Sequence, residues 1–201
     1  MSSSLTYATL IISGTTVKSL AANLPALRST ASSQGNIFVK GGTFDLLTYT
    51  ANRGTSTTGG NFNIDNGATV KIGGTNGFPS NYSNKAFQLS STVHYYGTNQ
   101  TVLAETYGNI IFSSSSGAVT KTMPGTAFTV EGNLTSNLGS GSSVSYTAAS
   151  AITINGDINI GTGTTFNGAS YTHNLGGNWI NNGTFTGSTS TITMIGASTA
   201  I

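Results

Sequence analysis

The sequence predicts an all-β protein, a right-handed parallel β-solenoid of about eight rungs with about 24 residues in each rung. Three observations predict it. A short Gly-Asn signature recurs at a nearly constant interval, apolar and polar residues alternate in segments of strand length, and helix signals are almost absent. The only plausible helical turn, residues 21–28, is interrupted by Pro25.

The recurring signature is a small residue followed by Asn or Asp and then by an alternating apolar run. The signatures begin at Gly35, Gly60, Gly108, Gly132, Gly156 and Gly177. These glycines are nearly evenly spaced, except that the interval from Gly60 to Gly108 equals two periods, with a weaker member at Asn84-Lys85. Side chains at one point of every coil stack along the coil axis, so a structural Asn ladder of stacked amides is expected. Its predicted members are Asn36, Asn61, Asn109, Asn133, Asp157 and Asn178.

Alternating residues provide the predicted core. Phe128 and Val130, Ile152 and Ile154, and the similar pairs 158/160 and 192/194 are spaced by two, which places them on one face of a strand. Gly-Ser, Gly-Thr and Asn-Gly pairs between these segments are typical of turns. A single rung cannot bury its apolar face, but stacked rungs can. An antiparallel sandwich or barrel also has short strands and regular turns, yet the observed period fits a coil better than a hairpin.

A longer repeat is superimposed on the short one. Residues 6–13 align with 106–113, and residues 94–97 align with 193–196. We therefore expect two continuous units of about four rungs each, residues 1–100 and 101–201. The chain is expected to be a segment of a longer array, so its first expected partners are neighbouring repeats of the parent chain. Exposed strand edges without polar caps also predict end-to-end self-association.

Composition excludes several classes of function. Charged residues make up 6% of the chain and hydrophobic residues 36%, and cysteine is absent, which excludes disulfides and thiolate chemistry. The seven basic residues are scattered, so no nucleic-acid partner is expected. No apolar stretch is long enough for membrane insertion. The first Lys is Lys18, so the N-terminal segment lacks a basic signal-peptide region; an export signal is expected outside this chain.

Catalytic chemistry is not predicted. Glu131 and Asp157 are separated by little more than one rung, and strand alternation places them on opposite faces as readily as on the same one. His94 and His173 have no acid in matching register. A calcium ladder needs several carboxylates, and only one ladder member, Asp157, is acidic. We therefore expect no enzyme, no catalytic residue, no metal and no cofactor.

Aromatic and threonine residues are the remaining candidates for binding groups. Tyr95 and Tyr96 are adjacent and point to opposite faces of a strand, so one of the two is expected to be exposed, and this pair is the predicted surface-binding site. Trp179 and Phe112 are expected in the core. Ice-binding solenoids present Thr-x-Thr ranks on a flat face, but the Thr-rich segments 162–165 and 189–193 do not repeat in register along the sequence, so ice binding is not predicted.

Several segments carry a family resemblance. They are Tyr96-Gly97-Thr98-Asn99-Gln100-Thr101-Val102, Tyr107-Gly108-Asn109-Ile110, Lys121-Thr122-Met123, Val130-Glu131-Gly132-Asn133-Leu134-Thr135 and Leu175-Gly176-Gly177-Asn178-Trp179-Ile180-Asn181-Asn182-Gly183-Thr184-Phe185. This pattern resembles very large repetitive surface proteins of Bacteroidetes-type bacteria. The resemblance implies a β-solenoid stalk or adhesin exported by type IX secretion and displayed at the cell surface, with surface glycans or other cells as further partners. The expected function is a non-catalytic structural or adhesive module of an extracellular protein. The alternative is a polysaccharide-binding or polysaccharide-cleaving β-helix.

Overall fold

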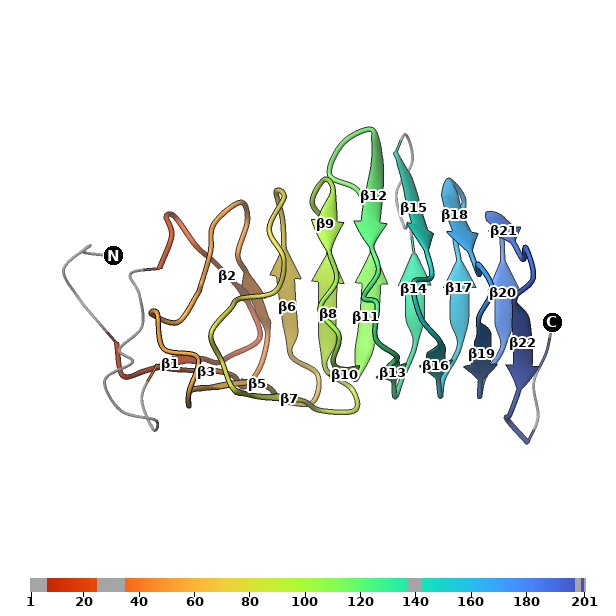
Figure 1. Ribbon diagram of the computed structural model, residues 1–201. Coiled ribbons are helices and arrows are strands. Elements are labelled where there is room, and N and C mark those ends of the chain that lie inside the picture. The colour runs from red at the N-terminus through yellow and green to blue at the C-terminus, as the bar shows by residue number, and fades with distance from the viewer. Residues whose placement is uncertain (1–6, 25–34, 137–141, 198–199, 201) are drawn as a thin grey trace.

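The structure, a computed structural model, describes residues 7–24, 35–136, 142–197 and 200. Residues 25–28 of the expected helical turn lie outside these ranges. The described residues form β-strands and no helix. Each strand pairs in parallel with a strand of the neighbouring coil. The coils stack into a rod along which the chain runs from one end to the other (Figure 1). The predicted fold class, a parallel β-solenoid, is confirmed.

One sheet runs through the whole rod and has eight strands. In spatial order they are β2 (Val17–Ser19), β4 (Thr43–Asp45), β6 (Thr69–Ile72), β8 (Thr92–Tyr95), β11 (Asn109–Phe112), β14 (Leu134–Ser136), β17 (Ile158–Ile160) and β20 (Trp179–Asn181). This sheet is the constant side of the solenoid, since every coil from β2 onwards contributes one strand to it.

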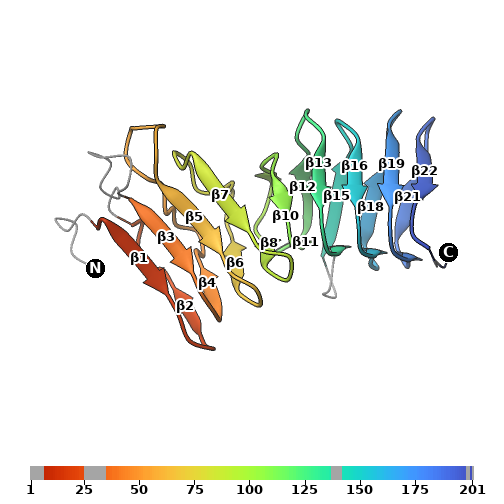
Figure 2. The same cartoon turned by 90° about the horizontal axis from the view of Figure 1, so that it is seen from below.

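The second side is divided between two sheets. The first consists of β1 (Thr9–Ile12), β3 (Asn36–Val39), β5 (Asn61–Ile64) and β7 (Asn84–Phe87). The second consists of β10 (Thr106–Tyr107), β13 (Phe128–Val130), β16 (Ile152–Ile154), β19 (Thr172–Leu175) and β22 (Thr191–Met194). Figure 2 shows that the strands of the first sheet run at a slant to those of the second.

The third side has a sheet only in the C-terminal part. Its strands are β9 (Gln100–Thr101), β12 (Ala118–Thr122), β15 (Ser143–Thr147), β18 (Thr164–Asn167) and β21 (Thr184–Thr186). In the described N-terminal coils, loops around residues 46–60 and 73–83 occupy this side instead. The cross-section therefore changes from two sheets to three near residue 100.

Coil length changes at the same place. The backbone N of Ser90 donates to Asn66 Oδ1, 24 positions earlier in the chain, which matches the predicted period. In the next coil Asn109 Nδ2 donates to the carbonyl oxygen of Ser91, only 18 positions earlier. The following step, from Asn109 to Asn133, is again 24 positions. The longer sequence repeat does not place its matching segments on the same side of the solenoid. β1 lies in the four-stranded sheet, whereas β11, whose sequence aligns with that of β1, lies in the eight-stranded sheet.

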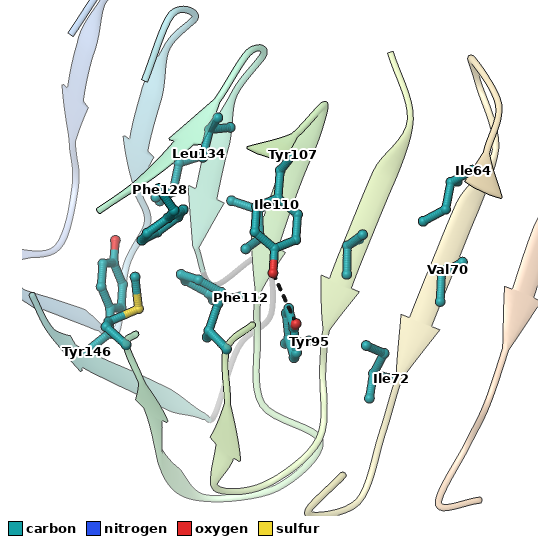
Figure 3. Close-up of a cluster of buried hydrophobic side chains, with 14 of the residues drawn as sticks. Ile64, Val70, Ile72, Tyr95, Tyr107, Ile110, Phe112, Phe128, Leu134 and Tyr146 are labelled. Atoms are coloured by element: carbon teal, nitrogen blue, oxygen red, sulfur yellow. Dashed lines mark hydrogen bonds between the residues drawn. The ribbon is translucent and has the colours of Figure 1, made fainter. Parts of the chain in front are cut away.

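Alternation along each strand fills the interior, as the spacing of apolar residues predicts. Phe112 packs against Tyr146 with ring centroids 5.2 Å apart, and Tyr107 packs against Phe128 at 6.1 Å. These rings and the aliphatic residues between them form one continuous core along the axis (Figure 3). Because each coil contributes side chains to the same core, a coil is stabilised by packing against its neighbours and not by contacts within itself.

A buried arginine fills the side that lacks a sheet. Arg53 is 1% exposed, and its Nη1 donates to the carbonyl oxygens of Ser56 at 2.9 Å and Thr58 at 3.0 Å. Tyr82 lies in the neighbouring loop and donates from its hydroxyl to the carbonyl oxygen of Ala51 at 2.7 Å. These bonds hold two irregular loops in place where no strand ladder does so.

Candidate functional site

The six predicted ladder residues fall into two separate columns. Asn36 begins β3 and Asn61 begins β5, and Asn36 Oδ1 accepts hydrogen bonds from the backbone N of Asn61 at 3.0 Å and from its Nδ2 at 2.9 Å. The remaining four residues lie at or just before strands of the eight-stranded sheet. A single column is not formed, because the signature moves from one side of the solenoid to another between Asn61 and Asn109.

The longer column is a relay from side chain to backbone. The backbone N of Asn133 donates to Asn109 Oδ1 at 2.9 Å, that of Asp157 to Asn133 Oδ1 at 2.8 Å, and that of Asn178 to Asp157 Oδ1 at 2.7 Å. The backbone N of Ala200 donates to Asn178 Oδ1 at 3.0 Å. The position therefore requires an oxygen acceptor and not stacked amides, which is why Asp can replace Asn at 157.

Four further asparagines form the same kind of bond and were not predicted. In each pair the Asn Oδ1 accepts a hydrogen bond of 2.9–3.0 Å from a backbone N in the following coil. The pairs are Asn23 with Thr50, Asn52 with Ser80, Asn66 with Ser90, and Asn99 with Thr120. None of these asparagines follows a glycine, so the Gly-Asn signature does not find them; an Asn one coil before a Ser or Thr is the signal that remains.

The glycines of the signature provide space for the relay. A Cβ built on Gly156 would lie 2.3 Å from Asn133 Oδ1 and 2.5 Å from the carbonyl oxygen of Gly132. Gly132 and Gly177 have equally close neighbours in the preceding coil. None of the three adopts a positive φ, so glycine is required here by close approach of two backbones and not by backbone conformation.

The relay can be tested at its only acidic member. We expect Asp157→Ala to destabilise the fold by about 1–2 kcal/mol, because the backbone N–H of Asn178 loses its acceptor. Asp157→Asn keeps an oxygen at the same place and is expected to change stability by less than about 0.5 kcal/mol. Urea unfolding followed by circular dichroism measures both. Equal destabilisation by the two substitutions would show that charge, and not the acceptor, matters at this position.

Tyr95 is not a surface residue, contrary to its predicted role in surface binding. It is 0% exposed, and its hydroxyl accepts a hydrogen bond from the backbone N of Leu103 at 3.2 Å and lies 3.2 Å from the hydroxyl of Tyr107 (Figure 3). Burial raises the pKa of Tyr95 to about 12. Position 95 has the same parity as the inward-facing Val93, so the adjacent pair splits with Tyr95 inside and Tyr96 outside.

Tyr96 lies on the outer surface in a charged cluster. Its hydroxyl donates to Asp45 Oδ1 at 2.9 Å, while Lys71 Nζ lies 4.5 Å from the ring centroid and 3.4 Å from Asp45 Oδ2. Desolvation, together with the Asp45 carboxylate, raises the pKa of Tyr96 to about 12. A Cβ on Gly73 would lie 2.8 Å from the ring, so the ring also covers the backbone there. The ring contacts the protein through Lys71 and Gly73, which limits stacking on a sugar.

His94 forms a contact with serine in the same region. Its Nε2 lies 2.7 Å from Ser113 Oγ, the arrangement of a base beside a nucleophile. Burial, with the positive charges of Lys71 and Lys121, lowers the pKa of His94 to about 4 and outweighs the opposing effect of Asp45. An imidazole with so low a proton affinity is a weak base for a serine hydroxyl. The pair therefore acts as a neutral hydrogen bond on the sheet surface.

The carboxylates considered for catalysis serve the inter-coil bonds. Glu131 Oε2 accepts from Asn155 Nδ2 at 2.7 Å, one coil away, and Asp157 Oδ1 accepts from the backbone of Asn178. Across residues 7–24, 35–136, 142–197 and 200, no three His, Asp or Glu side chains gather as metal ligands would. His173 lies inside, where Nδ1 accepts from the backbone N of Ile152 at 3.2 Å and Nε2 lies 3.0 Å from the carbonyl oxygen of Gly168.

Lys121 is a buried cation that sequence reasoning did not single out. It is 0% exposed, and its Nζ donates to the carbonyl oxygens of Gly97 and Thr98, both at 2.9 Å, and to Gln100 Oε1 at 2.7 Å. Desolvation lowers the pKa of Lys121 to about 8. The alternation of inward and outward residues along the strand indicates this burial, because Lys121 lies two residues from both Val119 and Met123, which are buried on the same face.

No family model, curated protein or solved structure matches the chain. In the part of the chain that the structure describes, no helix is long and apolar enough to cross a membrane.

Proposed function

We propose that this chain is a rod-like structural or adhesive module of a large, repetitive protein displayed outside the cell, and that it is not an enzyme. The observation that carries the proposal is the eight-stranded parallel sheet that extends along the whole rod. Eight strands at a spacing of about 4.8 Å give a sheet roughly 35 Å across. A module of this shape adds length in proportion to its number of coils, which suits a stalk.

The use of polar side chains supports the same proposal. Asparagine oxygens, the two buried cations and the Glu131–Asn155 pair all form bonds between coils or to nearby backbone. Such bonds stabilise the stack without creating a set of groups directed at one substrate. The low charge content, 6% of residues, fits a neutral, hydroxyl-rich and amide-rich exterior.

The coil that contains β20, β21 and β22 supports stacking of further coils. Trp179, Phe185, Ile192 and Met194 line an open apolar hollow of about 200 Å³. The backbone N of Trp179 donates to the carbonyl oxygen of Ala200 at 2.9 Å, so residue 200 already lies in the next ladder position beside β20. Neighbouring repeats of the parent chain, or a second copy in end-to-end association, would continue both the ladder and the apolar core here.

The proposal is tested by shape and adhesion together. Small-angle scattering of the monomeric fraction is expected to show an elongated particle. Beads coated with the chain are expected to be retained on at least one of a panel of glycan-coated and cell-coated surfaces if the module is adhesive; an elongated particle without retention identifies a spacer. Release of reducing ends from a polysaccharide panel would overturn the non-catalytic assignment, and a compact particle would overturn the rod.

A further inference from the structure

The sheet on the third side presents two ranks of hydroxyl and amide side chains to solvent. Strand register places the first rank in consecutive coils. The second rank lies two residues further along the same strands, which in a strand means the same face. The first rank is Asn99, Thr120, Ser145, Thr165 and Thr184, and the second is Thr101, Thr122, Thr147, Asn167 and Thr186. We name these ten residues the threonine face.

The residues of the threonine face are outward-facing. Eight of the ten are exposed, and Ser145 and Asn167 are half-buried. The residues between the two ranks point inwards and are Gln100, Lys121, Tyr146, Phe166 and Phe185. The strands lie side by side along the C-terminal part of the rod (Figure 1). The packed interior thus supports the array from below, and the β-branched threonines have few side-chain rotamers.

None of the ten residues of the threonine face is charged. Over β9, β12, β15, β18 and β21 the only ionisable cation or carboxylate is Lys121, and its ammonium group lies inside with three oxygen acceptors. The eight-stranded sheet, in contrast, carries the Lys71–Asp45 ion pair, in which Lys71 is partly exposed and Asp45 is buried. None of the ten outward residues is aromatic, so the face lacks the rings on which sugars stack.

The spacing of the array is set by the fold. Coils of a parallel sheet repeat at about 4.8 Å, and two residues along a strand span about 6.7 Å. An uncharged grid of hydroxyl, amide and methyl groups with these two repeats matches a partner that is itself uncharged and periodic in two directions. Ordered water at the surface of ice has this chemistry, with oxygens that donate and accept hydrogen bonds on a regular lattice.

We propose that the threonine face binds ice through ordered water. This goes beyond the rod-like function, since a rod without the face would still be a stalk. The sequence did not reveal the array because its members are unevenly spaced. After Thr120 the first rank continues at Ser145, Thr165 and Thr184, at intervals that shorten from one coil to the next, so a constant period does not align them.

The test compares one substitution on two faces. Thr165→Tyr places a bulky side chain in the middle of the threonine face, and Tyr is well accepted in strands. Thr172→Tyr is the matched control, because Thr172 is also an exposed strand threonine but lies on β19, in the neighbouring sheet. Circular dichroism and thermal unfolding first establish that both variants fold like the unsubstituted chain. A second variant, Thr147→Tyr, replaces Thr165→Tyr if the latter fails to fold.

Ice recrystallisation inhibition and ice-crystal shaping are the measurements. The unsubstituted chain and Thr172→Tyr are expected to be active, and Thr165→Tyr is expected to lose activity at the same concentration. An inactive unsubstituted chain, or equal activity of both variants, would overturn the proposal. Binding to crystalline cellulose or chitin that is lost in Thr165→Tyr without any effect on ice would assign the face to a polysaccharide and would also overturn it. Neither result depends on whether the chain is a stalk.

Discussion

Replacing Gly156 with alanine is expected to destabilise the solenoid by about 3 kcal/mol, at the upper end of the usual cost of overpacking. The new Cβ would lie 2.3 Å from Asn133 Oδ1 and 2.5 Å from the carbonyl oxygen of Gly132. Backbone atoms of the preceding coil cannot move away without lengthening the inter-coil hydrogen bonds on either side. Thermal and urea unfolding followed by circular dichroism measure the effect.

Gly125→Ala is the matched control for this substitution. No heavy atom lies within 4 Å of a Cβ built at Gly125, and its φ is not positive. Alanine there is expected to be neutral or to stabilise by about 0.4–1 kcal/mol, because it reduces the freedom of the unfolded chain. Combining Gly156→Ala with Asn133→Ala should recover part of the loss, since one of the two close contacts is removed. Strict additivity of the two substitutions would contradict the proposed clash.

The second large effect is expected at Lys121. We expect Lys121→Met to destabilise the fold by about 3 kcal/mol, because three buried oxygen acceptors lose their donor and each costs about 1 kcal/mol or more when unsatisfied. The acceptors are the carbonyl oxygens of Gly97 and Thr98 and the side chain of Gln100. Lys40 is exposed, so Lys40→Met is the control and should change stability by less than about 0.5 kcal/mol.

Lys121 also predicts a pH dependence. Its pKa falls from the usual 10.5 to about 8 in the fold, so between these values the unfolded chain binds more protons than the folded chain at this site. Stability from this group is therefore complete above pH 10.5 and is lost as the pH falls through 8. Chemical unfolding of the unsubstituted chain should show stability rising with pH above 8, and Lys121→Met should lack this rise.

Two tyrosines are expected to lower stability at high pH. Burial raises the pKa of Tyr95 to about 12, and desolvation together with the Asp45 carboxylate raises the pKa of Tyr96 to about 12, both above the usual 10.0. Above pH 10 the unfolded chain loses tyrosine protons that the folded chain retains, so stability should decrease in both the unsubstituted chain and Lys121→Met. A rise that persists in Lys121→Met would contradict the assignment to the lysine.

Alternation and the Gly-Asn signature were sufficient to predict the coil and its core. Pairs such as Ile152 and Ile154 lie inside because strand geometry alone sends every second side chain to one face. The close approach that selects Gly132 and Gly156 recurs at Gly108 and Gly177, and so it appears in the sequence as a period. Features that depend on this local geometry are therefore visible without a structure.

Features that depend on the register between coils were not predictable. Thr9 pairs with Asn36 across a long coil, whereas Thr92 pairs with Asn109 across a much shorter one, because loops at the corners differ in length. The two asparagine columns, the contact of His94 with Ser113 and the threonine face all depend on these lengths. The loop positions around Arg53 also carry no alternation, so nothing in the local sequence indicated a buried guanidinium.

The asparagine bonds give the rod a direction. In the pairs described above the side-chain oxygen belongs to the earlier coil and the donating backbone N–H to the later one. Each coil therefore presents side-chain acceptors to its C-terminal neighbour and backbone donors to its N-terminal neighbour. Only head-to-tail stacking of rods would extend the same hydrogen-bond polarity from one molecule to the next.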